Sequence, residues 1–175
     1  MRRQTIVQGE HAVIAEPDVV VTTILGSCVA VCLHDPQRRI GGMNHFLLPQ
    51  PAGGSLQGVL DPQRYGIHAM EVLINALMAR GAERSRLKAH CYGGAQVVAG
   101  LGDIGAENCA FARHFLATEH ITVVHEDLGG RNARRVEFMP FLGRSRCLTV
   151  REPAPPANTR LPLRLPERAG ELELF

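Results

Sequence analysis

A run of β-branched residues that is interrupted once by a small Gly-Ser step constrains the fold most. Residues 19–25, VVVTTIL, predict a strand, because β-branched side chains pack well on a pleated surface. GSC breaks the pattern, and residues 29–34, VAVCLH, predict a second strand. The segment DPQR at 35–38 predicts a tight turn, with Asp at its first position and Pro at its second. The sequence IGGMNHFLLP then returns as a third strand, so an antiparallel hairpin is expected.

The clearest helix is predicted over residues 61–81. Asp61 suits the N-cap, Pro62 suits the first helical position, and Gly81 suits the position just after the helix end. Further elements are expected as a helix within 105–119 and as short strands in LKAHCY, ITVVHEDLGG, RRVEFM and RCLTV. This succession predicts an α/β fold with a largely antiparallel sheet and two main helices.

The composition changes after Val150. A chain of 175 residues suits one domain, and we expect this domain to occupy residues 1–150. Residues 151–175 contain five prolines and no periodic apolar pattern, so they are expected to form an extended or disordered tail. Leucines between these prolines also suit a docking segment for a partner.

Composition and charge argue against several functions. A net charge of +2, scattered arginines and no Trp give no basis for expecting nucleic-acid binding. The sequence contains no apolar run long enough for membrane insertion and no signal-peptide core, so a cytoplasmic protein is expected. Five cysteines without a CxxC pair favour neither a disulfide framework nor a metal site.

Cys28 and His45 form the candidate catalytic pair. A two-residue loop at the 35–38 turn would set Cys28 directly opposite His45 on the hairpin. An imidazole beside a thiol can take its proton and hold the thiolate as an ion pair, and a third polar group often orients the imidazole. Thr22 and Thr23 both precede the Gly-Ser break and could supply that group. The alternative is a buried cysteine beside a hydrogen-bonded core histidine.

The segment before the cysteine offers backbone support for such a reaction. Gly26 permits an unusual backbone turn, and amides around Gly26, Ser27 and Cys28 could face a developing oxyanion. Cys32 is expected to be a packing residue on the same strand, and His34, at the end of that strand, is expected at the surface.

Five segments form an ordered series of motifs along the chain: LGSCVAVCLHDPQRRIGGMNHFLLP, YGIHAMEVLINALMARGA, YGGAQVV, IGAEN and DLGGRNARRVEF. In these motifs the sequence resembles the CheD family, the chemoreceptor glutamine deamidases of bacterial chemotaxis, and the resemblance covers roughly residues 5–150. It implies a layered α/β/β sandwich like that of the deamidating cytotoxic necrotizing factor toxins. It also implies hydrolysis of receptor glutamine to glutamate through a cysteine thioester, without metal or organic cofactor.

The resemblance assigns roles by motif position. It implies Cys28 as nucleophile, His45 as base and acid, and Thr22, six residues before the cysteine, as the third member. Methyl-accepting chemotaxis receptors are the implied substrate, and a CheC-type phosphatase is an implied partner in some bacteria. Two other functions stay open: a general cysteine hydrolase, and a non-catalytic adaptor that binds receptors or such a phosphatase.

Overall fold

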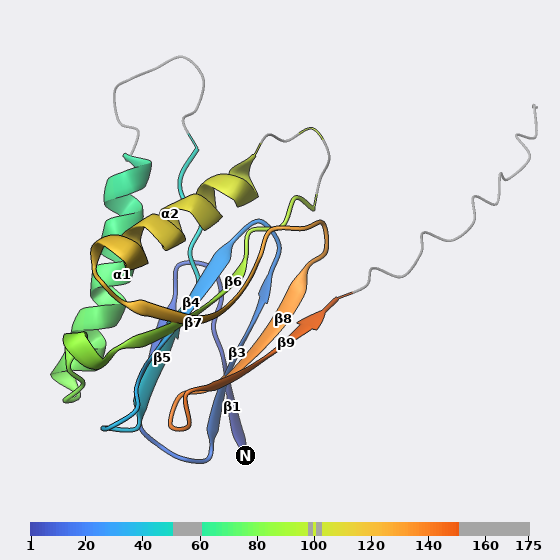
Figure 1. Ribbon diagram of the computed structural model, residues 1–175. Coiled ribbons are helices and arrows are strands. Elements are labelled where there is room, and N and C mark those ends of the chain that lie inside the picture. Colours follow the sequence, from blue (N-terminus) through green and yellow to red (C-terminus); the bar gives the residue numbers. More distant parts are fainter. Residues whose placement is uncertain (51–60, 98–99, 101–102, 151–175) are drawn as a thin grey trace, which may run out of the picture.

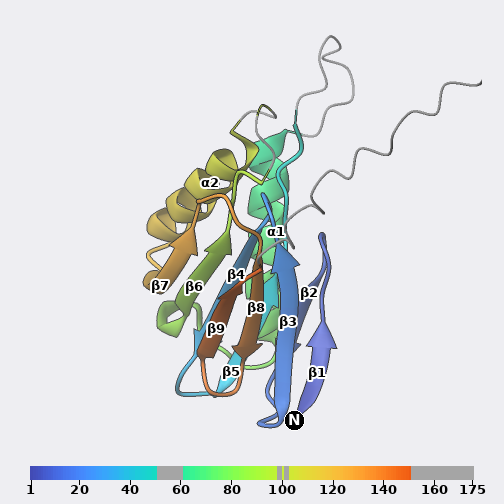
Figure 2. The ribbon, with the colours of Figure 1, turned by 90° about the vertical axis from the view of Figure 1, so that its right-hand side faces the viewer.

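Two β-sheets and two helices are stacked in three layers (Figures 1 and 2). The computed structural model describes residues 1–50, 61–97, 100 and 103–150. Sheet A has the order β1-β3-β8-β9, with bounds Arg2–Thr5, Val19–Leu25, Arg134–Met139 and Arg144–Thr149. Sheet B has the order β2-β5-β4-β6-β7, with bounds His11–Ile14, Ile40–Asn44, Val29–Asp35, Lys88–Gly93 and Thr122–Leu128. The helices are α1, Pro62–Ala79, and α2, Ile104–Thr118, with a 3₁₀ turn η1 at Arg84–Arg86.

The predicted fold class is confirmed. Both sheets are mostly antiparallel, and the parallel pairs are β1 with β3 and β6 with β7. Figure 2 shows both helices on one side of sheet B, with sheet A on its other side. The order of layers is therefore helices, sheet B, sheet A. The expected division into a 1–150 domain and a tail stays a prediction, because residues 151–175 lie outside the described residues.

Two apolar cores hold the layers together. One lies between the helices and sheet B and includes Leu73, Leu77 and Phe115, and the other lies between the sheets and includes Leu25 and Phe138. Strand β4 contributes to both cores, and all seven of its residues are buried. This explains its continuous apolar sequence, because a strand covered on both faces has no solvent side to alternate with.

The end signals predicted for the first helix are confirmed. The Asp61 carboxylate accepts a hydrogen bond from the Gln63 amide at 3.0 Å, and Pro62 begins α1. Gly81 follows the C-cap with a φ of +96°, a conformation that favours glycine. The expected strands and second helix are also present, whereas β1 and β2 were not anticipated, because β1 is short and fully exposed.

The expected two-residue hairpin loop is wrong. Asp35 pairs with Ile40, so four residues, 36–39, form the loop between β4 and β5. Asp35 is fully buried, and its carboxylate accepts hydrogen bonds from the amides of Gln37 and Arg38 and forms an ion pair with Arg86 at 2.8 Å. These bonds keep Asp35 within the sheet and place the turn after it.

His34 is another correction, because the structure buries its side chain instead of exposing it. Its ring lies beneath Gly143 in the turn between β8 and β9, where a Cβ would come within 2.3 Å of the ring. Sheet A thus covers this end of β4. Among the described residues, no helix is long and apolar enough to cross a membrane.

Candidate active site

Residues 26–28, which we call the nucleophile loop, carry the chain from β3 in sheet A to β4 in sheet B. Each of its three carbonyls accepts a hydrogen bond: Gly26 from the Ala95 amide at 2.8 Å, Ser27 from the Asn108 side chain at 2.9 Å, and Cys28 from the Gly94 amide at 2.8 Å. The amides of Ser27 and Cys28 donate to no other residue within the part of the chain that the structure describes. The loop is therefore fixed by its carbonyls and keeps its donors available.

Glycine is required beside this loop and not within it. Gly93 and Gly94 have φ values of +111° and +65°, and a Cβ on Gly93 would lie 2.1 Å from the Cys28 carbonyl oxygen. Gly26, by contrast, has no positive φ, so the unusual backbone turn expected there is not observed. The Gly93–Gly94 backbone can approach Cys28 because neither residue has a side chain.

His45 is held by a directed chain of hydrogen bonds between the sheets. The Thr23 hydroxyl donates to the Ile6 carbonyl at 2.8 Å and lies 2.8 Å from Nδ1 of His45. A hydroxyl has a single proton, so Thr23 can only accept from the ring, and Nδ1 must carry the hydrogen. The Nε2 atom of His45 then has a free lone pair, and it has no hydrogen-bond partner among the described residues. This is the tautomer that a general base needs.

Cys28 and His45 share one face of sheet B. They flank the Val29–Phe46 bridge, whose two backbone hydrogen bonds are 3.0 and 2.9 Å long. The observed register shifts the pair from directly opposite to diagonal, a separation of about 7–8 Å between residues of this kind. Because side chains alternate with a period of two, a shift of two residues leaves both on the face toward sheet A. No hydrogen bond joins the two described side chains.

The structure brings Thr23, and not Thr22, to the histidine. Val19, Val21 and Leu25 point into the core between the sheets, and Thr23 follows the same alternation. Thr22 points to the outer face of sheet A, where its hydroxyl lies 3.1 Å from that of Thr5. The expected placement of Thr22 beside His45 is therefore wrong, and the orienting contact belongs to its neighbour.

This contact makes a prediction for two adjacent threonines. Thr23→Val is expected to lower kcat by roughly 10–100-fold, because a hydrogen bond to the imidazolium that forms in the reaction contributes about 1.5–3 kcal/mol. Thr22→Val, the matched control on the outer face, is expected to change kcat less than about threefold. Steady-state ammonia release from both variants gives the comparison. A larger loss at Thr22 would contradict the geometry.

Burial sets the protonation states of the pair. Desolvation raises the pKa of the Cys28 thiol, and the Cys28 amide offsets this only in part. Desolvation also lowers the pKa of His45, because the charged imidazolium is the disfavoured form. Both shifts favour a neutral thiol beside a neutral imidazole in the free protein. These directions favour a general-base arrangement, in which His45 takes the proton during attack, over the expected resting ion pair.

These directions predict the pH dependence. Turnover should fall only as the pH drops below the ordinary histidine pKa of about 6.5, since His45 must be neutral and its pKa is lowered. Alkylation of Cys28 by iodoacetamide should be slow at neutral pH and rise with pH toward the raised thiol pKa. Peptide mapping separates Cys28 from the other four free thiols. A plateau of fast alkylation at neutral pH would indicate a preformed thiolate and contradict the neutral pair.

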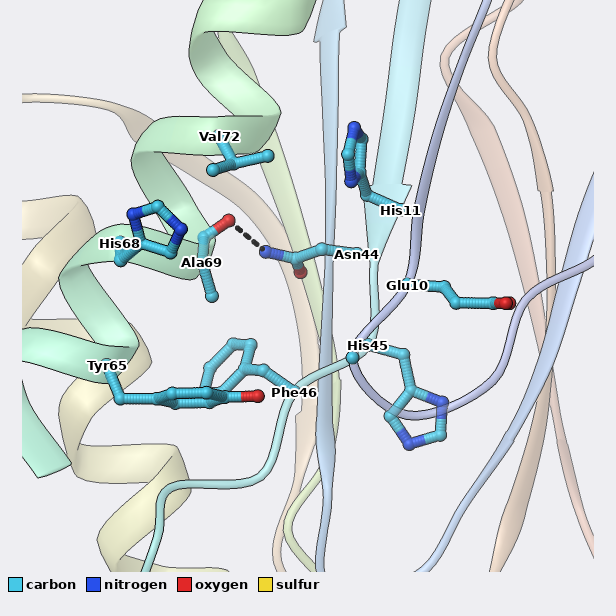
Figure 3. A pocket seen from close by; sticks show the side chains of 10 residues that line it. Glu10, His11, Asn44, His45, Phe46, Tyr65, His68, Ala69 and Val72 are labelled. Carbon is cyan, nitrogen blue, oxygen red and sulfur yellow. Dashed lines mark hydrogen bonds between the residues drawn. The ribbon is translucent and has the colours of Figure 1, made fainter. Parts of the chain in front are cut away.

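A cavity of about 290 Å³ lies behind the backbone of His45, between α1 and strands β2 and β5. Figure 3 shows the His45 ring turned away from helix α1 and from His68, while Tyr65 and Asn44 lie on the cavity side. Asn44 donates to the Ala69 carbonyl at 3.3 Å and so ties β5 to α1. The cavity is therefore separate from the face on which Cys28 and His45 meet.

Two positioning residues escaped the sequence analysis. Asn108 on α2 is fully buried, and it donates to the Ser27 carbonyl and accepts from the Leu48 amide, both at 2.9 Å. It thereby joins the nucleophile loop to the segment that follows His45. Arg134 donates to the Gly93 carbonyl at 3.1 Å and pairs with Asp127 at 3.0 Å. The sequence signal for Asn108 was an amide residue at helical spacing with the apolar residues Phe111 and Phe115, since an amide on a buried helix face is normally paired.

The other cysteines differ from Cys28 in their surroundings. Cys32 is fully buried between the sheets, as expected of a packing residue, and Cys91 and Cys109 are buried as well. Burial raises the pKa of Cys91 to about 12 and that of Cys147 to about 11. Among the described residues, no group of three or more His, Cys, Asp or Glu side chains is placed to hold a metal ion. Cys28 differs from these thiols because it lies in the nucleophile loop, on the face of sheet B that also carries the unpartnered Nε2 of His45.

Comparison with known families places the chain in one of them. Residues 47–149 match the family model described as CheD chemotactic sensory transduction. The chain belongs to the CheD family. The match begins just after His45, so the CheD model covers α1, α2 and the Gly93–Gly94 support but neither Cys28 nor His45.

Whole-chain relatives extend the CheD match across the site. A probable chemoreceptor glutamine deamidase CheD of Zymomonas mobilis is 50% identical over 177 residues, which cover 99% of this chain and 93% of the relative. A protein with the same description from Caulobacter vibrioides is 50% identical over 97% of this chain and 91% of its own length. A third, from Acidiphilium cryptum, is 49% identical over 99% and 94%. These alignments include the nucleophile loop.

Proposed function

We propose that this protein hydrolyses glutamine side chains of methyl-accepting chemotaxis receptors to glutamate through a thioester on Cys28. The observation that carries the proposal is the hydrogen-bond chain from Ile6 through Thr23 to His45, because it leaves Nε2 as the free base on the face of Cys28. Membership in the CheD family and relatives described as probable chemoreceptor glutamine deamidases support the choice of substrate.

The first half of the reaction transfers the acyl group. His45 Nε2 takes the thiol proton as Sγ attacks the carboxamide carbon, and the carbonyl electron pair moves onto oxygen. Unused amides of the nucleophile loop can stabilise that oxyanion. The tetrahedral intermediate collapses when its C–N bond breaks, and the His45 imidazolium gives its proton to the departing ammonia. The Thr23 hydroxyl accepts from Nδ1 throughout, which holds the ring in position.

The second half repeats the chemistry with water. His45 is neutral again after ammonia leaves, and it removes a proton from the attacking water. The thioester carbon adds hydroxide, the C–S bond breaks, and the sulfur recovers its proton from the imidazolium. The products are the free thiol and a glutamic acid side chain, which ionises to glutamate by releasing a proton to solvent. The protons exchanged with the sulfur, the departing ammonia and the attacking water pass through Nε2, and Cys28 and His45 end the cycle neutral, as they began it.

The test is a receptor assay. A purified cytoplasmic fragment of a methyl-accepting receptor is incubated with the protein, ammonia is measured, and peptide mapping locates any Gln-to-Glu conversion. Conversion that depends on Cys28 supports the proposal. Binding without ammonia release would favour the adaptor, and peptide cleavage would favour a general cysteine hydrolase.

The proposal has two further parts: the protein acts in the cytoplasm, and it binds a CheC-type phosphatase. Co-purification with a CheC-type protein tests the second part.

A further inference from the structure

The turn between β1 and β2 is fastened to the backbone of His45. The Gly9 amide donates to the His45 carbonyl at 2.7 Å, and the His45 amide donates to the Glu10 carbonyl at 3.0 Å. Within the turn, the Glu10 amide donates to the Val7 carbonyl at 3.0 Å, and Gly9 has a φ of +87°. Figure 3 shows Glu10 beside His45 on this turn. Any side chain that the turn carries is thus placed relative to the catalytic histidine.

That side chain is Gln8, and it reaches the nucleophile. The Cys28 thiol donates to Oε1 of Gln8, with 3.6 Å between sulfur and oxygen. The Cys28 amide also faces its own sulfur, where it acts to lower the thiol pKa. A side-chain amide and a backbone amide therefore both lie beside the sulfur atom. The contact with Gln8 is not accounted for by the Cys28–His45–Thr23 arrangement.

The contact seen at rest must change when the thiol loses its proton. A carbonyl oxygen is a good acceptor for S–H, but it repels a thiolate or an oxyanion. A half-turn about the last side-chain bond exchanges Oε1 with Nε2, because the two ends of a carboxamide have nearly the same shape. Gln8 then presents an N–H donor where it had presented an acceptor. The turn backbone need not move for this exchange.

We propose that Gln8 supplies, together with the Cys28 amide, the oxyanion hole of the reaction. This inference rests on the proposed acyl transfer for its chemistry. As the Sγ–C bond forms, the carbonyl electron pair moves to oxygen, and Nε2 of Gln8 and the backbone N of Cys28 donate to that oxygen. When the C–N bond breaks, the pair returns to re-form the carbonyl and both donors are released. Gln8 is a catalytic residue in this scheme because it contacts the reacting oxygen.

The experiment compares two reactions of the same sulfur. Acylation of Cys28 by p-nitrophenyl acetate passes through an oxyanion, whereas displacement by iodoacetamide does not. Gln8→Leu keeps the approximate size of the side chain and removes its donor, and it should slow acylation by roughly 10²–10³-fold, the usual loss for one oxyanion donor. Alkylation by iodoacetamide, measured at high pH where the thiol is ionised in both proteins, should stay within about threefold of the wild-type rate. The matched control is Gln4→Leu on the exposed strand β1, which should alter neither reaction.

Several results would overturn the proposal. Acylation of Gln8→Leu at the wild-type rate would remove Gln8 from the reaction, and equal losses in both reactions would show a structural role only. Wild-type acylation no faster than that of free cysteine would mean that no oxyanion hole exists. Conversion of Gln8 to glutamate in wild type but not in Cys28→Ala would make Gln8 a substrate instead.

The proposed function can fail separately from this inference. A receptor fragment that releases no ammonia, while acylation of Cys28 still depends on Gln8, would reject the proposed function and leave the role of Gln8 standing.

Discussion

Replacing Cys28 with alanine is expected to abolish ammonia release from a receptor fragment. Without the sulfur no thioester can form, and loss of a catalytic nucleophile typically lowers kcat by roughly 10⁴–10⁶-fold. The fold should persist, because the nucleophile loop is fixed by its three backbone carbonyls and not by the thiol. Among the described residues, the thiol donates one long side-chain hydrogen bond, to Gln8 at 3.6 Å. Ammonia release and a melting curve on the same sample test both halves of the expectation.

The chain offers a matched control for that variant. Cys147 in β9 is the other half-buried thiol. Its Sγ donates a hydrogen bond to Oδ2 of Asp127 at 3.4 Å, away from the nucleophile loop. Cys147→Ala should keep kcat within about threefold of wild type. Activity of Cys28→Ala within twofold of wild type would remove Cys28 from the mechanism, and an equal loss in both variants would indicate a structural effect.

Replacing His45 with glutamine is expected to lower kcat by about 10²–10⁴-fold, because general acid–base catalysis commonly contributes that much. Glutamine retains hydrogen-bonding groups that can face Thr23, but it cannot carry a proton from the thiol to ammonia. Cys28 should still be alkylated at high pH, where the thiol ionises without help. A variant that is inactive in turnover but alkylated normally at high pH isolates the proton-transfer role.

His68 provides the comparison for this second variant. It lies on α1 beside the cavity behind His45, and Figure 3 shows its ring apart from that of His45. His68→Ala should leave turnover within about threefold of wild type. A comparable loss at His68 would mean that the cavity takes part in the reaction, and near-normal turnover of His45→Gln would reject the general-base assignment.

The elements of this fold were predictable wherever local chemistry decides them. Asp61, Pro62 and Gly81 mark the ends of α1 in the sequence, and each has the predicted place in the structure. The register of the β4–β5 hairpin was not predictable from its turn residues. Asp35 is held in the sheet by Arg86, which is 51 positions away, and a turn rule contains no information about that partner.

The candidate site was predictable to a similar extent: residue type marks some of its members in the sequence, whereas others are placed only by contacts between distant segments. Cys28 and His45 stand out by residue type, and the structure places them on one face. The choice between Thr22 and Thr23 depends on which face of β3 is inward, and VVVTTIL has too little polar alternation to show this. Gln8 and Asn108 come to the nucleophile loop from β1–β2 and α2, and such contacts arise only from the packing of the layers.

The nucleophile loop joins one sheet to the other, and this has a consequence for the nascent protein. Cys28 directly precedes strand β4 of sheet B, while Thr23, which fixes the tautomer of His45, belongs to sheet A. A chain whose sheets have not yet docked therefore has a cysteine and a histidine but no oriented base. During synthesis or after partial unfolding, such a chain would carry only an ordinary thiol. Catalytic competence therefore requires the two sheets to be docked, because only then does Thr23 orient His45.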